Sequence, residues 1–275
     1  MTESLLDAVV ERIRSARRVL FLTGAGMSAE SGIPTFRDRD GYWRNFPIFK
    51  EKGLAPQDLA SPWAFRTVLH HAWAFYEWRR RNAYENKPHG GYAVLCEWMS
   101  DLLPESFIHT TNTDGYHLRA GTPRDRLREV HGSMWRLQCL DGCTDRFWEE
   151  PRVPLCDLDL YTLCASNFPV CRYCGGVARP HILMFNDGEY VGHPEQDTRY
   201  RTFRRNGVDL VFLIGCSGGV PTNDYEALSC QERGAVLVNV NPDPSANPSV
   251  RADISLVGGA ASVLSALNRR LAGKK

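Results

Sequence analysis

The sequence has no apolar run long enough to cross a membrane, since no stretch approaches the roughly 18 consecutive apolar residues that a spanning helix needs. It also has no recognisable signal peptide, because acidic residues interrupt every apolar run in residues 1–19. That segment instead repeats apolar side chains at helical spacing, which predicts an amphipathic helix. We therefore expect a cytoplasmic protein without a membrane partner.

An excess of charge of either sign is also missing. The 33 basic and 32 acidic residues leave a formal net charge of +1. Nothing in this balance indicates the basic surface typical of nucleic-acid binding, so we expect no direct nucleic-acid partner. The 43% hydrophobic and 24% charged content is ordinary for a globular chain. A length of 275 residues suits one large domain, or one domain with a smaller insert.

The cysteines do not indicate a disulfide framework, because there are nine of them in a chain too long for a disulfide-stapled miniprotein. Four of them form two close pairs: Cys139 with Cys143, and Cys171 with Cys174. Two short pairs that each direct two thiolates at one point predict a tetrahedral structural zinc site. Cys156 and Cys164 lie between the pairs and stay open as alternative ligands.

Short apolar runs alternate with helical patterns through most of the chain. The runs typical of buried strands are residues 18–23, 106–110, 208–214, 235–240 and 254–257. Helical patterns such as 91–100 and 222–233 lie between them. This alternation predicts the α/β class, with a Rossmann-like, doubly wound parallel sheet covered by helices on both faces.

Two segments break this alternation. Residues 46–86 are rich in aromatic side chains and are predicted to be helical, whereas residues 136–178 contain the paired cysteines and show little periodicity. We expect the two inserts to form a smaller zinc-binding and helical domain together. The Rossmann-like domain then comprises residues 1–45, 87–135 and 179–275.

The strongest functional motif runs from Thr23 to Asp38 and reads TGAGMSAESGIPTFRD. Its first half places glycines directly after a strand, where the backbone can approach a pyrophosphate at the start of a helix. Gly-x-Gly alone is weak evidence, because the third glycine of the dinucleotide fingerprint is missing. The second half adds an aromatic ring that can shield a reactive centre and an arginine that can hold phosphate or ribose oxygens.

Together with five further motifs in the same order, this segment resembles the sirtuins, which are NAD-dependent protein-lysine deacylases, and the chain looks like a divergent bacterial-type branch. The other motifs are TTNTDGYH (110–117), EVHGS (129–133), the cysteine pairs, GVARPHILMF (176–185), and GCS (215–217) with NVN (239–241). The resemblance covers nearly the whole chain. It implies NAD as cofactor, a structural zinc ion and an acyl-lysine protein or peptide as substrate.

The resemblance also implies residue roles. His131 is expected to be the catalytic base that takes a proton from a ribose hydroxyl, and its ordinary pKa of about 6.5 suits this role. Asn112, the second catalytic candidate, is expected near the nicotinamide ribose, and Asp114 at the nicotinamide amide; the alternative for both is a turn before Gly115. The other cofactor-binding candidates are Gly24, Ala25, Gly26, Ser28, Thr35, Phe36, Arg37, Thr111, Gly215, Cys216, Ser217, Asn239 and Asn241.

Candidate substrate-binding residues fall into two groups. Tyr76 and Arg79 share one face of a predicted helix, where a phenol and a guanidinium can bind a carboxylate together. Sirtuins that prefer succinyl- or malonyl-lysine carry the same Tyr-x-x-Arg, although a packed tyrosine beside a solvated arginine is the alternative. The resemblance also implies a peptide channel lined by His181, Ile182 and Leu183, in which a peptide adds as a strand.

The chain departs from the sirtuin pattern at places near these sites. Thr111 stands where the family usually has glutamine, Asn186-Asp187 is inserted into its Phe-Gly-Glu motif, and Cys216 lies in a looser version of Gly-Thr-Ser-Leu. These changes leave open an NAD glycohydrolase or a mono-ADP-ribosyltransferase on the same fold. A third alternative is a non-catalytic NAD-sensing protein, although the intact His131 counts against it.

Overall fold

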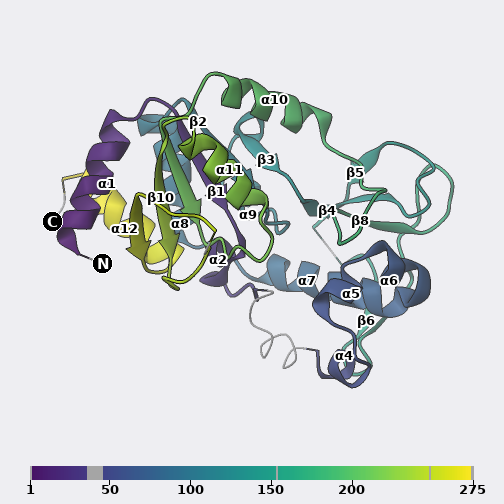
Figure 1. Cartoon of the computed structure of the whole chain (residues 1–275). Helices are drawn as coiled ribbons and strands as arrows, with labels where there is room; N and C mark the ends of the chain where they lie inside the picture. The colour runs from purple at the N-terminus through teal and green to yellow at the C-terminus, as the bar shows by residue number, and fades with distance from the viewer. Residues whose placement is uncertain (1, 36–45, 153, 248, 274–275) are drawn as a thin grey trace.

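The computed structural model describes residues 2–35, 46–152, 154–247 and 249–273 (Figure 1). Its centre is a six-stranded parallel sheet in the order β11-β10-β9-β1-β2-β3. The strands are β1 (Val19–Thr23), β2 (Ser106–Thr110), β3 (Leu127–Glu129), β9 (Leu210–Ile214), β10 (Val236–Asn241) and β11 (Ile254–Val257). The strand order reverses at β1, because the chain builds the sheet first toward β3 and later from β9 toward β11.

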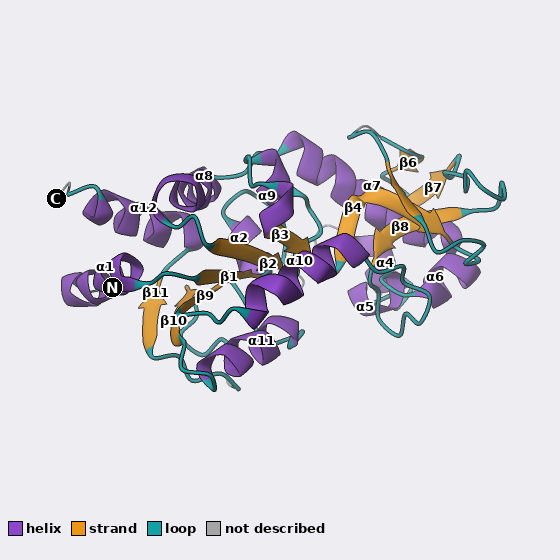
Figure 2. Cartoon of the chain, turned by 90° about the horizontal axis from the view of Figure 1, so that it is seen from above, coloured by secondary structure: helices purple, strands orange, loops and turns teal. Residues whose placement is uncertain are grey.

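Helices cover both faces of this sheet, as the view in Figure 2 shows. One face packs on α1 (Glu3–Ser15), α8 (Gly90–Glu97) and α12 (Ala260–Leu271), and the other on α10 (Pro194–Arg205) and α11 (Thr222–Gln231). Alternate side chains of β1 point to opposite faces of the sheet. Phe21 packs in the core under the first set of helices, and Leu22 packs in the core under the second. The prediction of a doubly wound α/β fold is confirmed.

The second part of the molecule, on the right of Figure 1, contains the two inserts. Its helices are α4 (Pro47–Glu51), α5 (Pro56–Leu59), α6 (Pro62–Thr67) and α7 (Leu69–Glu85). The first three begin with proline, which suits the first position of a helix because its amide would lack a helical partner anyway. The long helix α7 buries its aromatic residues Trp73, Phe75 and Tyr76, as expected of the aromatic insert.

An antiparallel sheet in the order β5-β4-β8 joins the two parts. Its strands are β4 (Gly132–Cys139), β5 (Phe147–Glu149) and β8 (Ala178–Ile182), and a hairpin of β6 (Asp157–Asp159) and β7 (Cys164–Ser166) lies nearby. Strand β4 crosses the predicted boundary between 135 and 136, and β8, which falls almost wholly in the segment assigned to the large domain, pairs with it. The domain boundaries therefore stay a prediction.

The remaining elements are short: α2 (Ala25–Ala29), α9 (Tyr116–Arg119), η1 (Trp98–Leu102) and η2 (Arg124–Arg126). Helix α1 buries Leu6, Val9, Val10 and Ile13, which confirms the amphipathic helix at the N-terminus. Across the part of the chain that the structure describes, no helix combines the length and apolarity needed to span a bilayer. The cellular location expected from the sequence stays a prediction.

Candidate functional site

Two glycine turns meet where the strand order reverses. Gly24 and Gly26 follow β1, Gly215 follows its neighbour β9, and the amide of Gly26 donates a 2.8 Å hydrogen bond to the Gly215 carbonyl. A Cβ atom on Gly26 would lie 2.7 Å from the Gly215 Cα, and one on Gly215, whose φ is +61°, would lie 2.3 Å from the Met27 nitrogen. Only glycine fits this contact. The carboxyl ends of β1 and β9 therefore form the crevice in which open α/β sheets bind nucleotides.

A buried hydrogen-bond network lies beside the first turn. The Ser28 hydroxyl donates to Asp114 Oδ2 (2.6 Å) and accepts from Asn112 Nδ2 (3.0 Å). The same Asn112 amide donates to the Gly24 carbonyl (2.9 Å). Asp114 Oδ1 accepts from the Tyr116 amide (2.8 Å), so this carboxylate also shapes the turn. The structure thus brings together three predicted site residues from two distant motifs.

The surroundings of Asp114 shift the pKa of its carboxyl group in opposite directions. Burial raises the pKa of Asp114, whereas the hydrogen bonds from Ser28 and Tyr116 and the positive charge of Arg79 lower it. Arg79 also acts on Tyr76, one turn earlier on α7. The nicotinamide-binding and acyl-binding residues predicted from the sequence are therefore electrostatic neighbours.

His131 lies half-buried in the connection between β3 and β4. Burial lowers the pKa of His131 to about 4, against a hydrogen bond to the main chain of Thr111 that raises it. Its Nε2 atom is 3.2 Å from the Thr222 hydroxyl, at the start of α11. The ring is consequently neutral at pH 7 and carries a lone pair that can accept a proton.

The other cofactor-binding candidates divide by exposure. Thr111 is half-buried and directs its hydroxyl to the Thr23 carbonyl (3.3 Å). Cys216 is buried, with its pKa raised to about 12 by burial, and its carbonyl accepts from the Asn241 side chain (2.6 Å). The other candidates that keep exposed or half-buried surface are Ala25, Gly26, Thr35, Ser217 and Asn239. Phe36 and Arg37 lie outside the described residues.

Tyr76 and Arg79 lie together on α7, as the sequence predicts for one helix face. The Tyr76 side chain is buried, and the Arg79 guanidinium lies 5.7 Å from the centre of its ring and 5.3 Å from that of Phe75. Burial raises the pKa of Tyr76 to about 12, and the charge of Arg79 opposes this rise. Arg79 as a whole residue is half-buried, and its guanidinium is held against these aromatic faces, where burial lowers its pKa.

The predicted peptide-channel residues at β8 differ in the exposure of their side chains. The His181 ring has 0% exposure, stacks between Phe147 (4.1 Å) and Tyr190 (4.9 Å), and hydrogen-bonds the Val191 carbonyl at 2.6 Å. This ring cannot line a peptide channel as the sequence suggests, and only its main chain is left for that role. Ile182 is buried as well.

Leu183 is the exposed member of this predicted set. Its side chain is 38% exposed, and its amide donates to the His131 carbonyl (3.0 Å). The end of β8 is thereby fixed directly beside the candidate base.

The inserted Asn186-Asp187 closes a rigid turn after this segment. Both oxygens of Asp187 accept from the Arg179 guanidinium (2.7 and 2.9 Å), and neither side chain is exposed. Asp187 also accepts from the amides of Met184 and Glu189. A bidentate pair whose remaining lone pairs are used holds its geometry well. We infer a structural role for the insert.

The four paired cysteines converge on one point. Their sulfur atoms all lie within 4.8 Å of one another, with Cys139–Cys174 at 3.8 Å and Cys143–Cys171 at 3.6 Å. Tetrahedral Zn²⁺ with Zn–S bonds of about 2.3 Å needs sulfur separations of about 3.8 Å. The donor set fits a structural zinc ion. Cys156 and Cys164 are not in the cluster; Cys164 lies beside a His71 ring nitrogen instead (3.6 Å).

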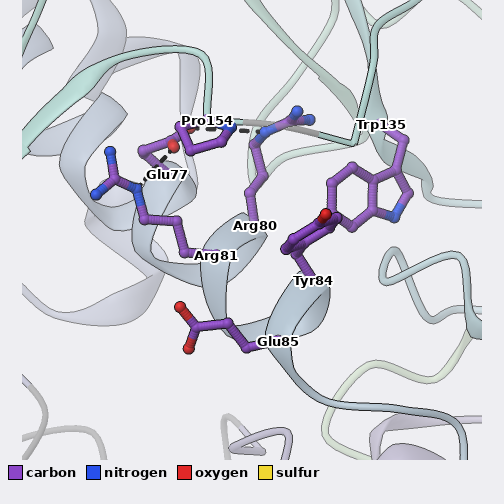
Figure 3. A pocket seen from close by; sticks show the side chains of 7 residues that line it. All are labelled: Glu77, Arg80, Arg81, Tyr84, Glu85, Trp135 and Pro154. Atoms are coloured by element: carbon purple, nitrogen blue, oxygen red, sulfur yellow. Dashed lines mark hydrogen bonds and ion pairs between the residues drawn. The ribbon is translucent and has the colours of Figure 1, made fainter.

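A pocket of about 250 Å³ lies between α7, Trp135 of β4 and Pro154 (Figure 3). It is lined by Glu77, Arg80, Arg81, Tyr84, Glu85, Trp135 and Pro154. Arg80 and Arg81 both pair with Glu77, and the Trp135 indole N–H donates to the Asp114 carbonyl (2.6 Å). The Arg80 guanidinium lies 4.7 Å from the centre of the Trp135 ring, so α7 contacts the turn that carries the candidate nicotinamide-binding residue through Trp135. We interpret the pocket as part of that support.

The crevice at the strand reversal, the buried Ser28–Asn112–Asp114 network and the neutral His131 define an NAD-binding α/β enzyme of the class that the sequence motifs suggest. The family model described as "Sir2 family" matches residues 24–222. The chain belongs to the Sir2 family.

Similar proteins agree with this membership. The chain is 35% identical to an NAD-dependent protein deacylase of Aeropyrum pernix, over 91% of this chain and 92% of the relative. It is 33% identical to one of Aquifex aeolicus, over 82% and 83% of the two chains. A crystal structure of a Sir2 homologue–NAD complex superimposes with a TM-score of 0.79 at 27% identity, over 97% of this chain and 94% of the other. A mutant Sir2 homologue with 2′-O-acetyl-ADP-ribose gives 0.76 at 29% identity, over 99% and 97%.

Proposed function

We propose that the protein is an NAD-dependent protein-lysine deacylase that releases nicotinamide and transfers the acyl group to ADP-ribose. The observation that carries the proposal is the neutral, half-buried His131, tied by Thr111 to the crevice between β1 and β9. The names of the relatives and the structures with NAD and acetyl-ADP-ribose support the same reaction.

We propose one orientation of NAD in the crevice. The pyrophosphate would lie at the glycine turns of Gly24 and Gly215, which pack directly against each other. Asn239, whose side-chain oxygen has no hydrogen-bond partner among the described residues, would face the adenosine half. Ser28 and Asp114 would face the nicotinamide amide. Bound NAD supplies an electrophilic ribose carbon and the ADP-ribose that accepts the acyl group.

The residues of the chain perform the proton chemistry. Asn112 holds the turn closed through the Gly24 carbonyl and presents its amide beside the ribose site. His131 accepts the proton of a ribose hydroxyl at Nε2, because its lowered pKa keeps this nitrogen unprotonated at neutral pH. The peptide would run along the main chain at Leu183, whose amide is bonded to the His131 carbonyl, so the acyl-lysine enters next to the base.

The lowered pKa of His131 predicts how kcat/KM depends on pH. With a pKa of about 4, His131 is almost fully neutral at pH 5.5, whereas with the ordinary value of about 6.5 it would be roughly 90% protonated there. We therefore expect kcat/KM for NAD to change less than about twofold between pH 7.5 and 5.5. An acid limb centred near 6.5, with a drop of roughly tenfold by pH 5.5, would contradict this environment for the base.

We further propose that Tyr76 and Arg79 recognise an acidic acyl group such as succinyl or malonyl. A phenol and a guanidinium packed together beside Asp114 offer two hydrogen-bond donors to a carboxylate at the inner end of the acyl site. The burial of the pair strengthens this contact, since a charge-assisted hydrogen bond contributes about 1.5–3 kcal/mol.

Arg79→Met is the direct test of acyl recognition. We expect it to lower kcat/KM for a succinyl-lysine peptide by roughly 10- to 100-fold relative to the acetyl-lysine peptide of the same sequence. Arg81→Met, on the same helix but paired with Glu77, is the matched control and should leave the ratio unchanged. An equal loss on both peptides in Arg79→Met would show that Arg79 supports the fold or NAD binding and does not select the acyl group.

NAD glycohydrolysis or ADP-ribosyl transfer is the second candidate function. The observation that favours it is Thr111, whose hydroxyl is spent on the Thr23 carbonyl where the family usually has a longer amide. Nicotinamide release with and without acyl-peptide separates the functions: a deacylase needs the peptide, and a glycohydrolase releases nicotinamide at the same rate without it.

A further inference from the structure

Thr222 is the side chain that contacts the candidate base, and the sequence motifs did not single it out. Its hydroxyl lies 3.2 Å from Nε2 of His131, and the residue is half-buried. It opens α11 directly after the loop that follows β9. The contact therefore joins the base to the start of α11.

The position of Thr222 is fixed by its neighbours. Asn223, which is buried, donates from Nδ2 to the Thr23 carbonyl (3.0 Å) and to Cys216 Sγ (3.1 Å). The Tyr225 amide bonds the Pro221 carbonyl and closes the first turn of the helix. The Thr222 hydroxyl is thereby held against the same strand end that carries the first glycine turn.

The hydrogen-bonding roles of the two partners follow from the tautomer of His131. A neutral imidazole has one donor and one acceptor nitrogen. The Thr111 amide already donates to the Thr23 carbonyl (3.0 Å), so the Thr111 main chain meets His131 through its carbonyl, which accepts from a ring N–H. The nitrogen that faces Thr222 is then the acceptor, and the hydroxyl donates to it. Thr111 and Thr222 together leave the ring one orientation.

This orientation is the one that proton transfer needs. Nε2 carries the lone pair, and it lies 3.2 Å from the Thr222 hydroxyl at the start of α11. The amino-terminal end of α11 adds a partial positive charge beside it, which disfavours protonation before NAD arrives. When a ribose hydroxyl takes the place of Thr222 at Nε2, its proton passes to the imidazole and the Thr222 hydroxyl keeps its own.

We propose that Thr222 is a positioning residue that holds the acceptor nitrogen of His131 toward the ribose hydroxyl of NAD. The inference rests on the proposed deacylase function. It assigns Thr222 to the step after nicotinamide departure, because the base acts only there, and it leaves nicotinamide departure itself independent of Thr222.

The test compares two rates in one reaction mixture. Exchange of labelled nicotinamide into NAD in the presence of acyl-peptide reports the first step, and free lysine reports complete turnover. We expect Thr222→Val, which keeps the shape and removes the hydroxyl, to lower turnover roughly tenfold with exchange within about twofold of wild type. Thr222→Ser should restore turnover, and Thr202→Val, on the exposed face of α10, is the control for a lost threonine hydroxyl.

Each outcome decides the proposal. Unchanged turnover in Thr222→Val overturns it, and so does a parallel loss of exchange and turnover, which shows a structural role; melting temperature and NAD binding check the latter. A wild-type protein that shows neither exchange nor turnover overturns the proposed function instead, and the inference with it.

Discussion

Replacing His131 by alanine is expected to lower deacylation roughly 10²- to 10⁴-fold, the contribution of a general base to such a step. The ring is half-buried and held by Thr111 and Thr222, so its loss removes the proton acceptor without opening the core. NAD binding is expected to persist, because the glycine turns and the Ser28–Asn112–Asp114 network do not depend on it. Turnover is measured by free lysine and NAD binding by calorimetry.

The control for this variant is His70→Gln. His70 is an exposed histidine of α7 whose Nδ1 lies 2.9 Å from the Ala165 carbonyl oxygen, far from the glycine turns in sequence. It should retain full turnover. Turnover of His131→Ala within a factor of about three of wild type, with both variants folded, would remove His131 from the mechanism.

Replacing Cys171 by serine is expected to release one zinc ion per chain and to lower the melting temperature by roughly 10 °C or more. Four thiolates within 4.8 Å of one another cannot pack without a cation that offsets their charge. Binding energy at such a structural site is folding energy, and the two cysteine turns fix the strands β4 and β8. Elemental analysis gives the metal, and thermal unfolding gives the stability.

Cys164→Ser is the matched control, since Cys164 lies in the same insert but outside the cluster. It should retain one zinc ion and a melting temperature close to wild type. A metal-free wild-type protein would contradict the zinc site, and loss of zinc in Cys164→Ser would mean that the ligand set is different.

The sheet was readable from the sequence because its strands are short, continuous apolar runs that end in glycine or polar motifs. The predicted strands at 106–110 and 254–257 match β2 and β11 in full. Parallel strands share one carboxyl-terminal edge, so the motif after β1 and the motif after β2 had to meet. The hydrogen bonds of Ser28, which follows β1, with Asn112 and Asp114, which follow β2, show that the two motifs are in contact.

The cysteine cluster was predictable for a similar reason. The spacing within each pair already brings two thiols together, so a zinc site requires only that the two pairs lie close to each other. The pairing of β4 with β8 brings them together. The alternative ligands Cys156 and Cys164 could be set aside only by the fold. The zinc prediction therefore depended on spacing alone, and the ligand choice on tertiary structure.

The side-chain directions around the substrate site were not predictable. His181 turns into a stack between Phe147 and Tyr190, which are brought together by β5 and by the loop after β8. Asp187 has the appearance of an inserted surface residue, yet it fills a buried site because Arg179 needs a carboxylate there. The direction of the His181 ring and the burial of Asp187 both depend on tertiary contacts that the local sequence pattern does not encode.

Thr222 shows the same limit at the catalytic centre. No motif marks it, because its role follows only from the pairing of β9 beside β1 and the packing of α11 against their ends. Local sequence places His131 and the glycine turns, and the tertiary structure decides which hydroxyl holds the base.

The central claim is that NAD cleavage and lysine deacylation are one coupled reaction. Mass spectrometry of a mixture of purified protein, NAD and a succinyl- or acetyl-lysine peptide tests it most directly. We predict free lysine peptide, nicotinamide and O-acyl-ADP-ribose in equal amounts at every time point, and none of the three when either substrate is omitted. Consumption of NAD to free ADP-ribose while the peptide stays acylated would contradict the account.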